Sequence, residues 1–513
     1  MKYVFPAAAI AAALSIVSVT ANAQDHGACE ALGHLKLPEV TSLVTETVPA
    51  GPFTAPGAGG PGPQPLTAQV PEFCRVTGVV APAIRFEVWL PGADAWNGRF
   101  QAVGGGGFAG VISYGAMLPA INAGYVTAST DTGHVAPDVE WLSDEGRLVD
   151  YGYRAIHEMT LKSKAIIDAY YDKAPDYSYF NGCSTGGRQG LMEAQRFPDD
   201  YDGIVTGAPV NYFVATHFTQ LWVALAAKAD DDTGVLSQAD LELVNRAALA
   251  QCDAADGVTD GVLEDPRSCD FDPAVLQCSS GGSAGQCLAE NQVAALRKIY
   301  DGPTSPSTGK KLHPGLVPGG EPSWLLVTSP GLVNIPYDYF GRSVLGNTQW
   351  NWRAFDFDKD AALATQKTGE VLDAIDPNLS RFRAQGGKLL LYHGWNDQVI
   401  FPEGSINYHE SVAATVAPGK GVEGVQDFFR LFMVPGMTHC RGGSGTDRFD
   451  AQAAIESWVE RGTPPARIEA SRVENGNVTR TRPLCAYPTT AKYDGSGDTN
   501  DAANFVCAEV IDP

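Results

Sequence analysis

The chain has 513 residues, of which 44% are hydrophobic, 19% charged and 9% aromatic, a composition typical of globular proteins. Its 59 acidic and 36 basic side chains give a net charge of -23. This charge argues against a nucleic-acid partner or an anionic membrane surface, because both need clustered lysine and arginine. The length allows two to four domains, or one large fold that carries an insertion.

The N-terminus has the features of an export signal. Lys2 supplies a positive charge, residues 7–19 form an apolar core, and Ala21-Asn22-Ala23 is a small-residue cleavage site. We therefore predict residues 1–23 as a signal peptide and expect a secreted or periplasmic mature chain that begins at Gln24. An anchor helix is the alternative, which the shortness of the apolar run disfavours, so we expect no membrane contact after the signal is removed.

Strands and helices alternate in the first part of the mature chain. A glycine- and proline-rich stretch at 49–65 is expected to be an exposed loop, and helical spacing of apolar residues predicts a helix over 151–171. Apolar runs and alternation predict strands at 84–90, 99–103, 125–129 and 177–181. This alternation indicates an α/β fold with a mostly parallel sheet.

A long segment of different character interrupts the predicted sheet. Buried strands are expected at 204–206 and 388–392, with another at 428–434, and the chain between the first two has helical stretches, cysteine-bounded loops and crowded aromatic residues. We interpret that segment as a lid domain inserted into the α/β domain. The expected division is a first α/β part at 24–211, the lid at 212–380 and a second α/β part at 381–513.

A candidate nucleophile lies in Gly182-Cys183-Ser184-Thr185-Gly186, which fits the pattern G-x-S-x-G. In this nucleophile elbow, small flanking residues permit a sharp turn between a strand and a helix that exposes the serine hydroxyl. The pattern alone is weak, but residues 177–181 before it are strand-like and residues 190–194 after it favour a helix. This context predicts an α/β-hydrolase fold with Ser184 as the nucleophile.

A serine hydroxyl needs an imidazole to take its proton and a carboxylate to orient that imidazole. In α/β-hydrolases these residues follow the serine in the order Asp, His. Asp397 follows the predicted strand 388–392 and His439 follows the predicted strand 428–434, so we predict them as orienting acid and general base. His393 is the competitor, but it precedes the acid, and its position at a strand end favours a packed, hydrogen-bonded core residue.

The glycine run Gly104–Gly107 follows the predicted strand 99–103. It lacks the Gly-Lys-Ser/Thr and G-x-G-x-x-G signatures of nucleotide sites, so we expect no nucleotide cofactor, and no redox cofactor is expected either. A loop in this position can donate a backbone N–H to a tetrahedral oxyanion, together with the residue after the nucleophile. We predict Gly106 and Thr185 as these donors, with the two glycines beside Gly106 as alternatives. A merely flexible loop is the other interpretation.

Three carboxylates, Asp253, Asp256 and Asp260, lie in a turn-rich loop between Cys252 and Cys269. Their mutual repulsion would be offset by a hard cation, and oxygen ligands without nearby histidine or free thiol suit Ca2+. The spacing is not that of an EF-hand. We predict a structural calcium site, with a solvated acidic turn as the alternative.

Aromatic side chains are crowded at 350–357 in the lid. Trp350 and Phe355 could stack on an aromatic acyl group, and Arg353 could meet a carboxylate or phenolate. Packing of the aromatic residues into the lid's own core is an equally good interpretation, so the sequence leaves both open.

Cys183-Ser184, Asp397 and His439-Cys440 together resemble the pattern of the tannase and feruloyl esterase family. Members of this family place a cysteine beside both the nucleophile and the histidine and join the two by a disulfide. The resemblance covers nearly all of the mature chain. Further matching segments are Trp96-Asn97-Gly98-Arg99-Phe100, 104–110, Asp131-Thr132-Gly133-His134, 203–209 and His393-Gly394-Trp395-Asn396-Asp397.

The resemblance implies a secreted serine carboxylesterase acting on small aromatic esters, with galloyl, hydroxycinnamoyl (including feruloyl) or terephthaloyl acyl groups. It also implies that the carbonyls of Val258 and Val262 complete the calcium shell. The ten cysteines agree with an oxidising compartment, but their connectivity does not follow from the residues alone. The resemblance implies the pairs Cys29–Cys74, Cys183–Cys440, Cys252–Cys269, Cys278–Cys287 and Cys485–Cys507.

Two other functions fit part of the pattern. A serine peptidase or amidase could use the same three residues on the same fold. A calcium-stabilised binding protein with an inert hydrolase fold would lack one member of the triad, and here all three candidates are present. The sequence does not indicate an oligomeric state.

Overall fold

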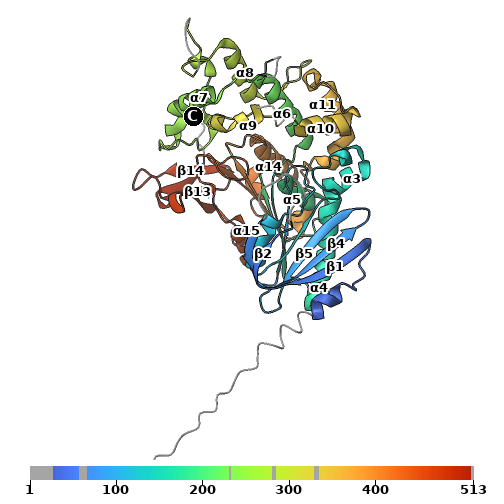
Figure 1. The fold of residues 1–513 in the computed structure, drawn as a ribbon. Coiled ribbons are helices and arrows are strands. Elements are labelled where there is room, and N and C mark those ends of the chain that lie inside the picture. Colours follow the sequence, from blue (N-terminus) through green and yellow to red (C-terminus); the bar gives the residue numbers. More distant parts are fainter. Residues whose placement is uncertain (1–26, 57–65, 230–232, 280–284, 329–333, 510–513) are drawn as a thin grey trace, which may run out of the picture.

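The computed structural model describes residues 27–56, 66–229, 233–279, 285–328 and 334–509 (Figure 1). The predicted export signal lies outside these residues. A nine-stranded sheet forms the centre of the molecule, in the order β1-β4-β5-β7-β6-β8-β9-β10-β11. Its strands are β1 Val40–Val48, β4 Phe73–Val80, β5 Ile84–Pro91, β6 Arg99–Val103, β7 Val126–Thr130, β8 Tyr177–Cys183, β9 Gly203–Gly207, β10 Lys388–Gly394 and β11 Phe429–Val434.

The sheet is parallel from β7 to β11 and antiparallel at its other edge. β6 pairs in parallel with β7 and β8, and the parallel pairing continues through β9 and β10 to β11. The pairs β1–β4, β4–β5 and β5–β7 are antiparallel. The predicted mostly parallel α/β sheet is therefore confirmed.

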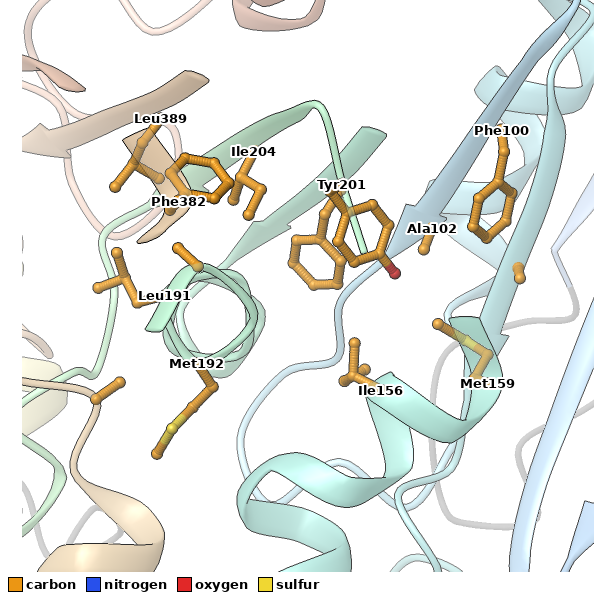
Figure 2. Close-up of a cluster of buried hydrophobic side chains, with 14 of the residues drawn as sticks. Phe100, Ala102, Ile156, Met159, Leu191, Met192, Tyr201, Ile204, Phe382 and Leu389 are labelled. Atoms are coloured by element: carbon orange, nitrogen blue, oxygen red, sulfur yellow. The ribbon is translucent and has the colours of Figure 1, made fainter. Parts of the chain in front are cut away.

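Both faces of the sheet are covered by helices, because its strands are apolar on both sides. Phe180, Ile204 and Leu389 pack on one side with α4 (Ala155–Tyr171), α5 (Thr185–Arg196) and α14 (Glu403–Val416). Their chain neighbours, including Tyr179 and Val205, pack on the other with α2 (Tyr114–Asn122) and α15 (Ala451–Arg461). Figure 2 shows Leu191 of α5 on the side of the sheet residues Ile204 and Leu389, whereas Met192 points away from them.

The segment between β9 and β10 is built mainly of helices, which lie together at the top of Figure 1. It contributes to two buried clusters: one around Phe340 and Phe355, which also includes Trp141 and Tyr151, and one around Leu241 and Leu296. Among the helices of the described residues, none combines the length and hydrophobicity needed to cross a membrane. The α-helices of this segment are α6 Phe213–Ala227, α7 Gln238–Cys252, α8 Glu290–Asp301, α9 Leu325–Thr328, α10 Asn334–Asp338, α11 Lys359–Ala364, α12 Glu370–Leu372 and α13 Ser380–Ala384.

One local prediction was wrong. The stretch 49–65 is not all loop, since β2 (Gly51–Thr54) pairs with β3 (Thr67–Val70), which lies beyond that stretch. The helix predicted over 151–171 is confirmed, and its first turn belongs to a π-helical segment, Asp150–Arg154, that precedes the α-helix from Ala155.

The C-terminal part adds two antiparallel hairpins that the sequence patterns did not reveal. They are formed by β12 Arg467–Glu474 with β13 Asn477–Cys485, and by β14 Thr489–Tyr493 with β15 Phe505–Glu509. Their outer faces are largely exposed, so the apolar signal along these strands is weak.

The five disulfides implied by the family resemblance are all formed. Four of them close short or moderate loops, with sequence separations between 9 and 45 residues. The fifth, Cys183–Cys440, joins segments 257 positions apart. The pairs are Cys29–Cys74, Cys183–Cys440, Cys252–Cys269, Cys278–Cys287 and Cys485–Cys507.

Close contact of α5 with the sheet depends on Gly190. A Cβ atom added there would lie 2.8 Å from Thr206 Cγ2 and 3.0 Å from both Ile204 Cγ2 and Phe180 Cδ1. We expect Gly190→Ala to lower the free energy of unfolding by about 1–3 kcal/mol, because the packed core must shift. Urea denaturation measures this change.

Gly115→Ala in α2 is the matched control. A Cβ there would have Leu66 Cδ2 at 3.8 Å as its neighbour, which is ordinary contact. This variant should be as stable as the wild type, or more stable by up to about 1 kcal/mol. Equal stability of the two variants would contradict the close packing of α5.

Candidate active site

Ser184 lies in the sharp turn between β8 and α5, where the sequence placed it. Its backbone has φ 63° and ψ −121°, a region that side-chain-bearing residues rarely adopt. Cβ atoms do not fit beside the turn: one added to Gly182 would lie 2.6 Å from the Gly186 carbonyl carbon, and one on Gly104 would lie 2.4 Å from Gly186 Cα. The structure thus explains the glycines of the G-x-S-x-G pattern by close backbone contact.

Asp397 and His439 follow neighbouring parallel strands, β10 and β11, at the same edge of the sheet. His439 Nδ1 lies 2.7 Å from Asp397 Oδ2 and donates to it. The other oxygen, Oδ1, accepts the N–H groups of Val399 and Ile400 at 2.8 and 2.9 Å. The Asp397 side chain is buried, whereas that of His439 is 21% exposed.

The two groups stabilise each other's charged forms. Burial by itself would raise the pKa of Asp397, but the charge of His439 and the hydrogen bonds from His393 and His439 lower that pKa well below its usual range. Burial by itself would lower the pKa of His439. The charge of Asp397 and the hydrogen bond to it outweigh this effect, so the pKa of His439 is raised. The pair can therefore hold an imidazolium that forms during a reaction.

His393 is a packed and hydrogen-bonded core residue, as the sequence indicated. Its Nε2 lies 3.2 Å from both Asp397 Oδ2 and the Ile400 carbonyl, so this nitrogen carries the proton, and Nδ1 lies 2.7 Å from Ser405 Oγ. Its contact with Asp397 was not predicted. The signal for it is the spacing of His393 and Asp397, four positions apart on either side of the end of β10.

The disulfide Cys183–Cys440 connects the elbow to the histidine loop. Its two Cα atoms are 6.1 Å apart, and its cysteines adjoin Ser184 and His439 in the chain. A covalent bond therefore holds together two loops that come from distant parts of the sequence.

The glycine loop docks against α5 through Gly105. Its N–H donates to Gln189 Oε1 at 3.0 Å, and its carbonyl accepts the Gly186 N–H at 2.8 Å. Gly105 is thereby removed from the alternatives for the oxyanion donor. The N–H groups of Gly106 and Gly107 have no acceptor within the part of the chain that the structure describes.

Thr185, the second predicted donor, is the first residue of α5. Its N–H is one of those in the first turn of the helix, and such N–H groups have no acceptor inside the helix. The positive end of the helix dipole also lies there and favours negative charge. The backbone at this point suits an anion.

The three aspartates of the predicted calcium loop are held close together at η3 (Asp253–Asp256) and the turn after it. Asp253 accepts the N–H groups of Asp260 and Gly261 at 3.2 and 2.9 Å. Asp260 Oδ2 lies 2.6 Å from Arg482 Nη2 and 3.2 Å from Arg480 Nη1. The two arginines offset part of the negative charge.

Oxygen ligands of this kind suit a hard cation, although the three aspartates do not each bring an oxygen within 4.8 Å of the others. Asp256, Asp260, Val262 and Glu264 are among the residues that line a small cavity. Burial raises the pKa of Asp256 to about 6 and that of Glu264 to about 8, and the neighbouring carboxylates add to both shifts. A divalent cation would offset this repulsion. Glu264, which lines the same cavity, was not among the predicted ligands, and Val258 within the loop is buried.

The described residues do bring three possible metal ligands together elsewhere, at α5, which carries Glu193. Atoms of His157, Glu193 and Asp200 come within 4.8 Å of one another, and His157 Nδ1 is 2.6 Å from Asp200 Oδ2. Burial, followed by the charge of nearby Asp200, raises the pKa of Glu193 well above its usual value. Both Glu193 carboxylate oxygens are buried and have no hydrogen-bond partner among the described residues.

The residues predicted as possible substrate contacts in the segment between β9 and β10 pack against their neighbours in the structure. Trp350 and Phe355 are 8% and 6% exposed and lie in one cluster with Phe340. Trp350 Nε1 donates to the Tyr337 carbonyl at 3.0 Å, and Arg353 Nη2 donates to a backbone carbonyl. The packing alternative that the sequence left open is the one observed.

Comparisons with known proteins place the chain in a family. The family model "Tannase and feruloyl esterase" matches residues 68–334 and 340–508. An uncharacterised esterase of Xanthomonas campestris pv. campestris is 39% identical, over 98% of this chain and 94% of its own length. Mono(2-hydroxyethyl) terephthalate hydrolase of Piscinibacter sakaiensis is 35% identical, over 94% of this chain and 91% of its own.

Solved structures give the same assignment. Feruloyl esterase B of Aspergillus oryzae superposes with a TM-score of 0.84 at 29% identity and covers 94% of this chain and 100% of its own. The tannin acyl hydrolase of Aspergillus niger, at 22% identity and a TM-score of 0.78, shares the fold and covers 94% of each chain. The predicted α/β-hydrolase fold is confirmed. The chain belongs to the tannase and feruloyl esterase family and is a carboxylic ester hydrolase.

Proposed function

We propose that this protein is a secreted serine esterase that hydrolyses esters of aromatic acids through an acyl-enzyme on Ser184. One observation carries the proposal: a strained nucleophile elbow is joined by Cys183–Cys440 to the loop of His439, whose imidazole is hydrogen-bonded to buried Asp397. Ser184, His439 and Asp397 then have the roles of nucleophile, general base and orienting acid.

The reaction follows from the tautomer of His439. Because Nδ1 donates to Asp397, Nε2 carries a lone pair that can take the Ser184 proton. The serine oxygen bonds to the ester carbonyl carbon, and the resulting oxyanion accepts the N–H groups of Gly106 and Thr185. The bond to the alcohol oxygen breaks and His439 returns the proton to the alcohol. A water molecule, deprotonated by His439, then bonds to the acyl carbon; the bond to the Ser184 oxygen breaks, and His439 returns the proton to that oxygen as the acid leaves.

The substrate class is supported by the names of the relatives. Besides the mono(2-hydroxyethyl) terephthalate hydrolase, feruloyl esterase B of Aspergillus niger is 30% identical over 85% of this chain. Terephthaloyl and feruloyl groups both carry an aromatic ring next to, or conjugated with, the ester carbonyl, and galloyl esters share this feature. We propose a small aromatic ester as the substrate.

Export is supported by the disulfides. Five of them within one chain suit an oxidising compartment outside the cytoplasm. The export-signal pattern in residues 1–23 also favours a location outside the cytoplasm.

The function is tested with feruloyl, galloyl and mono(2-hydroxyethyl) terephthaloyl esters, each beside its matched amide. We expect the esters to be cleaved and Ser184→Ala to lower turnover by about 10^3- to 10^6-fold, because the nucleophile is lost. Circular dichroism and the melting temperature control for folding. Faster cleavage of the amides would favour a peptidase or amidase, and an inactive wild-type protein would favour the inert binding protein. Near-normal turnover of folded Ser184→Ala would contradict the mechanism.

The disulfide beside the site should matter for rate as well as stability. The double variant Cys183→Ala, Cys440→Ala loses a loop closure worth up to about 5 kcal/mol. Displacing a catalytic group by about 1 Å can cost on the order of 100-fold in rate. We therefore expect turnover to fall by more than the loss of folded protein explains, measured at a temperature where the variant is folded.

Cys278→Ala, Cys287→Ala is the control, because it opens a disulfide between residues nine positions apart in the lid segment. It should change the melting temperature with little change in turnover. Equal losses of turnover in the two double variants would show that the position of Cys183–Cys440 has no special effect.

We further propose that Asp253, Asp256 and Asp260, with the carbonyls of Val258 and Val262, hold a structural Ca2+. Chelation should lower the melting temperature while activity survives until the fold loosens, because the aspartates take no part in the proposed reaction. Asp256→Asn should remove most of the chelator's effect. A reversible loss of turnover at unchanged melting temperature would contradict a structural role.

A further inference from the structure

We infer that Tyr151 is a positioning residue that holds the glycine loop in the geometry of the oxyanion hole. The sequence patterns gave no indication of it, since Tyr151 was assigned only to a helix. The inference rests on the proposed function of Ser184 and adds a residue that supports the oxyanion donors without touching the substrate.

Tyr151 contacts the glycine loop directly. Its hydroxyl donates to the Gly107 carbonyl at 3.0 Å, and Thr185 Oγ1 donates to the same carbonyl at 2.5 Å. On the other side, the Gly105 carbonyl accepts the Gly186 N–H at 2.8 Å. The loop is therefore held against the nucleophile elbow on both sides of Gly106.

The tyrosine ring is itself fixed. Tyr151 is 1% exposed, and its ring centroid lies 4.6 Å from that of Trp141 and 6.2 Å from that of Phe213. The guanidinium carbon of Arg188 lies 4.8 Å from the ring centroid on another side. The hydroxyl can thus hold Gly107 in place, because the ring that carries it has little room to move.

Arg188 connects this ring to the helix that follows the nucleophile. It lies on α5, three residues after Thr185, and is fully buried. Its guanidinium donates to the carbonyls of Tyr151 at 3.0 Å and Gly152 at 2.8 Å. Burial lowers its pKa, and both terminal nitrogens of the guanidinium are paired, whereas its Nε has no partner among the described residues. These bonds hold the Tyr151 backbone at a fixed distance from the elbow.

The local backbone adds an independent observation. Tyr151 lies in the π-helical turn Asp150–Arg154, between α3 (Glu145–Val149) and α4. Such turns are rare and occur frequently at functional sites, because they change the direction of a side chain relative to a regular helix. Here the turn coincides with the residue that reaches the glycine loop.

Loss of the hydroxyl should affect the transition state more than substrate binding. Tyr151→Phe keeps the ring and its contacts but removes one of the two donors to Gly107. The oxyanion exists only after Ser184 attacks, so a loosened donor loop weakens its stabilisation and leaves ground-state binding intact. We expect kcat to fall about 10-fold with KM unchanged, less than the roughly 100-fold lost with a direct donor.

An aromatic boronic acid provides the second measurement. Its boron accepts the Ser184 oxygen while His439 takes the proton, and the tetrahedral adduct places a boron-bound oxygen where the oxyanion would lie. Tyr151→Phe should weaken inhibition by this compound about 10-fold, in parallel with kcat, by the same loss of oxyanion stabilisation. Inhibition by the corresponding aromatic carboxylic acid, which forms no such adduct, should not change.

Tyr339→Phe is the matched control, because the Tyr339 hydroxyl is also buried and lies 2.6 Å from Thr368 Oγ1, within the lid segment. It should lower stability without changing kcat or boronate inhibition. The inference is overturned if Tyr151→Phe behaves like Tyr339→Phe in both assays. The inference is also overturned if, in Tyr151→Phe, KM and inhibition by the aromatic carboxylic acid change as much as kcat.

Ser184→Ala, measured in the same series, separates this inference from the proposed function. Normal turnover of folded Ser184→Ala would overturn the proposed function and the role of Tyr151 with it. Loss of turnover in Ser184→Ala, with unaltered kcat and boronate inhibition in Tyr151→Phe, would overturn the role of Tyr151 alone.

Discussion

Backbone contact at the start of α5 is the constraint on which the rest of the site depends. Gly186 leaves no room for Cβ atoms on Gly104 or Gly182, and a Cβ on Gly187 would lie 2.4 Å from the Gly207 carbonyl oxygen. The elbow, the glycine loop and the end of β9 therefore meet with main chain against main chain. In the mechanism that we propose, these main-chain N–H groups bind the oxyanion.

Two further connections hold the histidine side of the site. The disulfide Cys183–Cys440 is covalent and fixes how far the loops can separate. The hydrogen bond from His439 to Asp397 is electrostatic and fixes the direction of the imidazole. Asp397 can remain charged although buried, because hydrogen-bond donors surround it, including His393. The disulfide thus sets the distance between the two loops, and Asp397 sets the orientation of the His439 imidazole.

Much of the fold and of the site could be predicted because the signals are local. Strands β8 to β10 are short apolar runs that end in glycine or a turn, and such runs are typical of buried parallel strands. The elbow pattern, followed by Asp397 and His439 after successive strands, is likewise a property of chain order. The hairpin β2–β3 was not predicted, because its two strands carry few buried residues.

The sequence by itself determined the fold class, the family and the candidate triad, because each depends on patterns within short stretches or on their order. Only the tertiary structure decided that the Gly105 amide is occupied, since it donates to Gln189, 84 positions away. It also decided that Trp350 packs in the lid core and that Tyr151 reaches Gly107, 44 positions away. The physical reason is that a hydrogen bond or a packing contact depends on the position of two distant segments in space, which no local pattern of residues specifies.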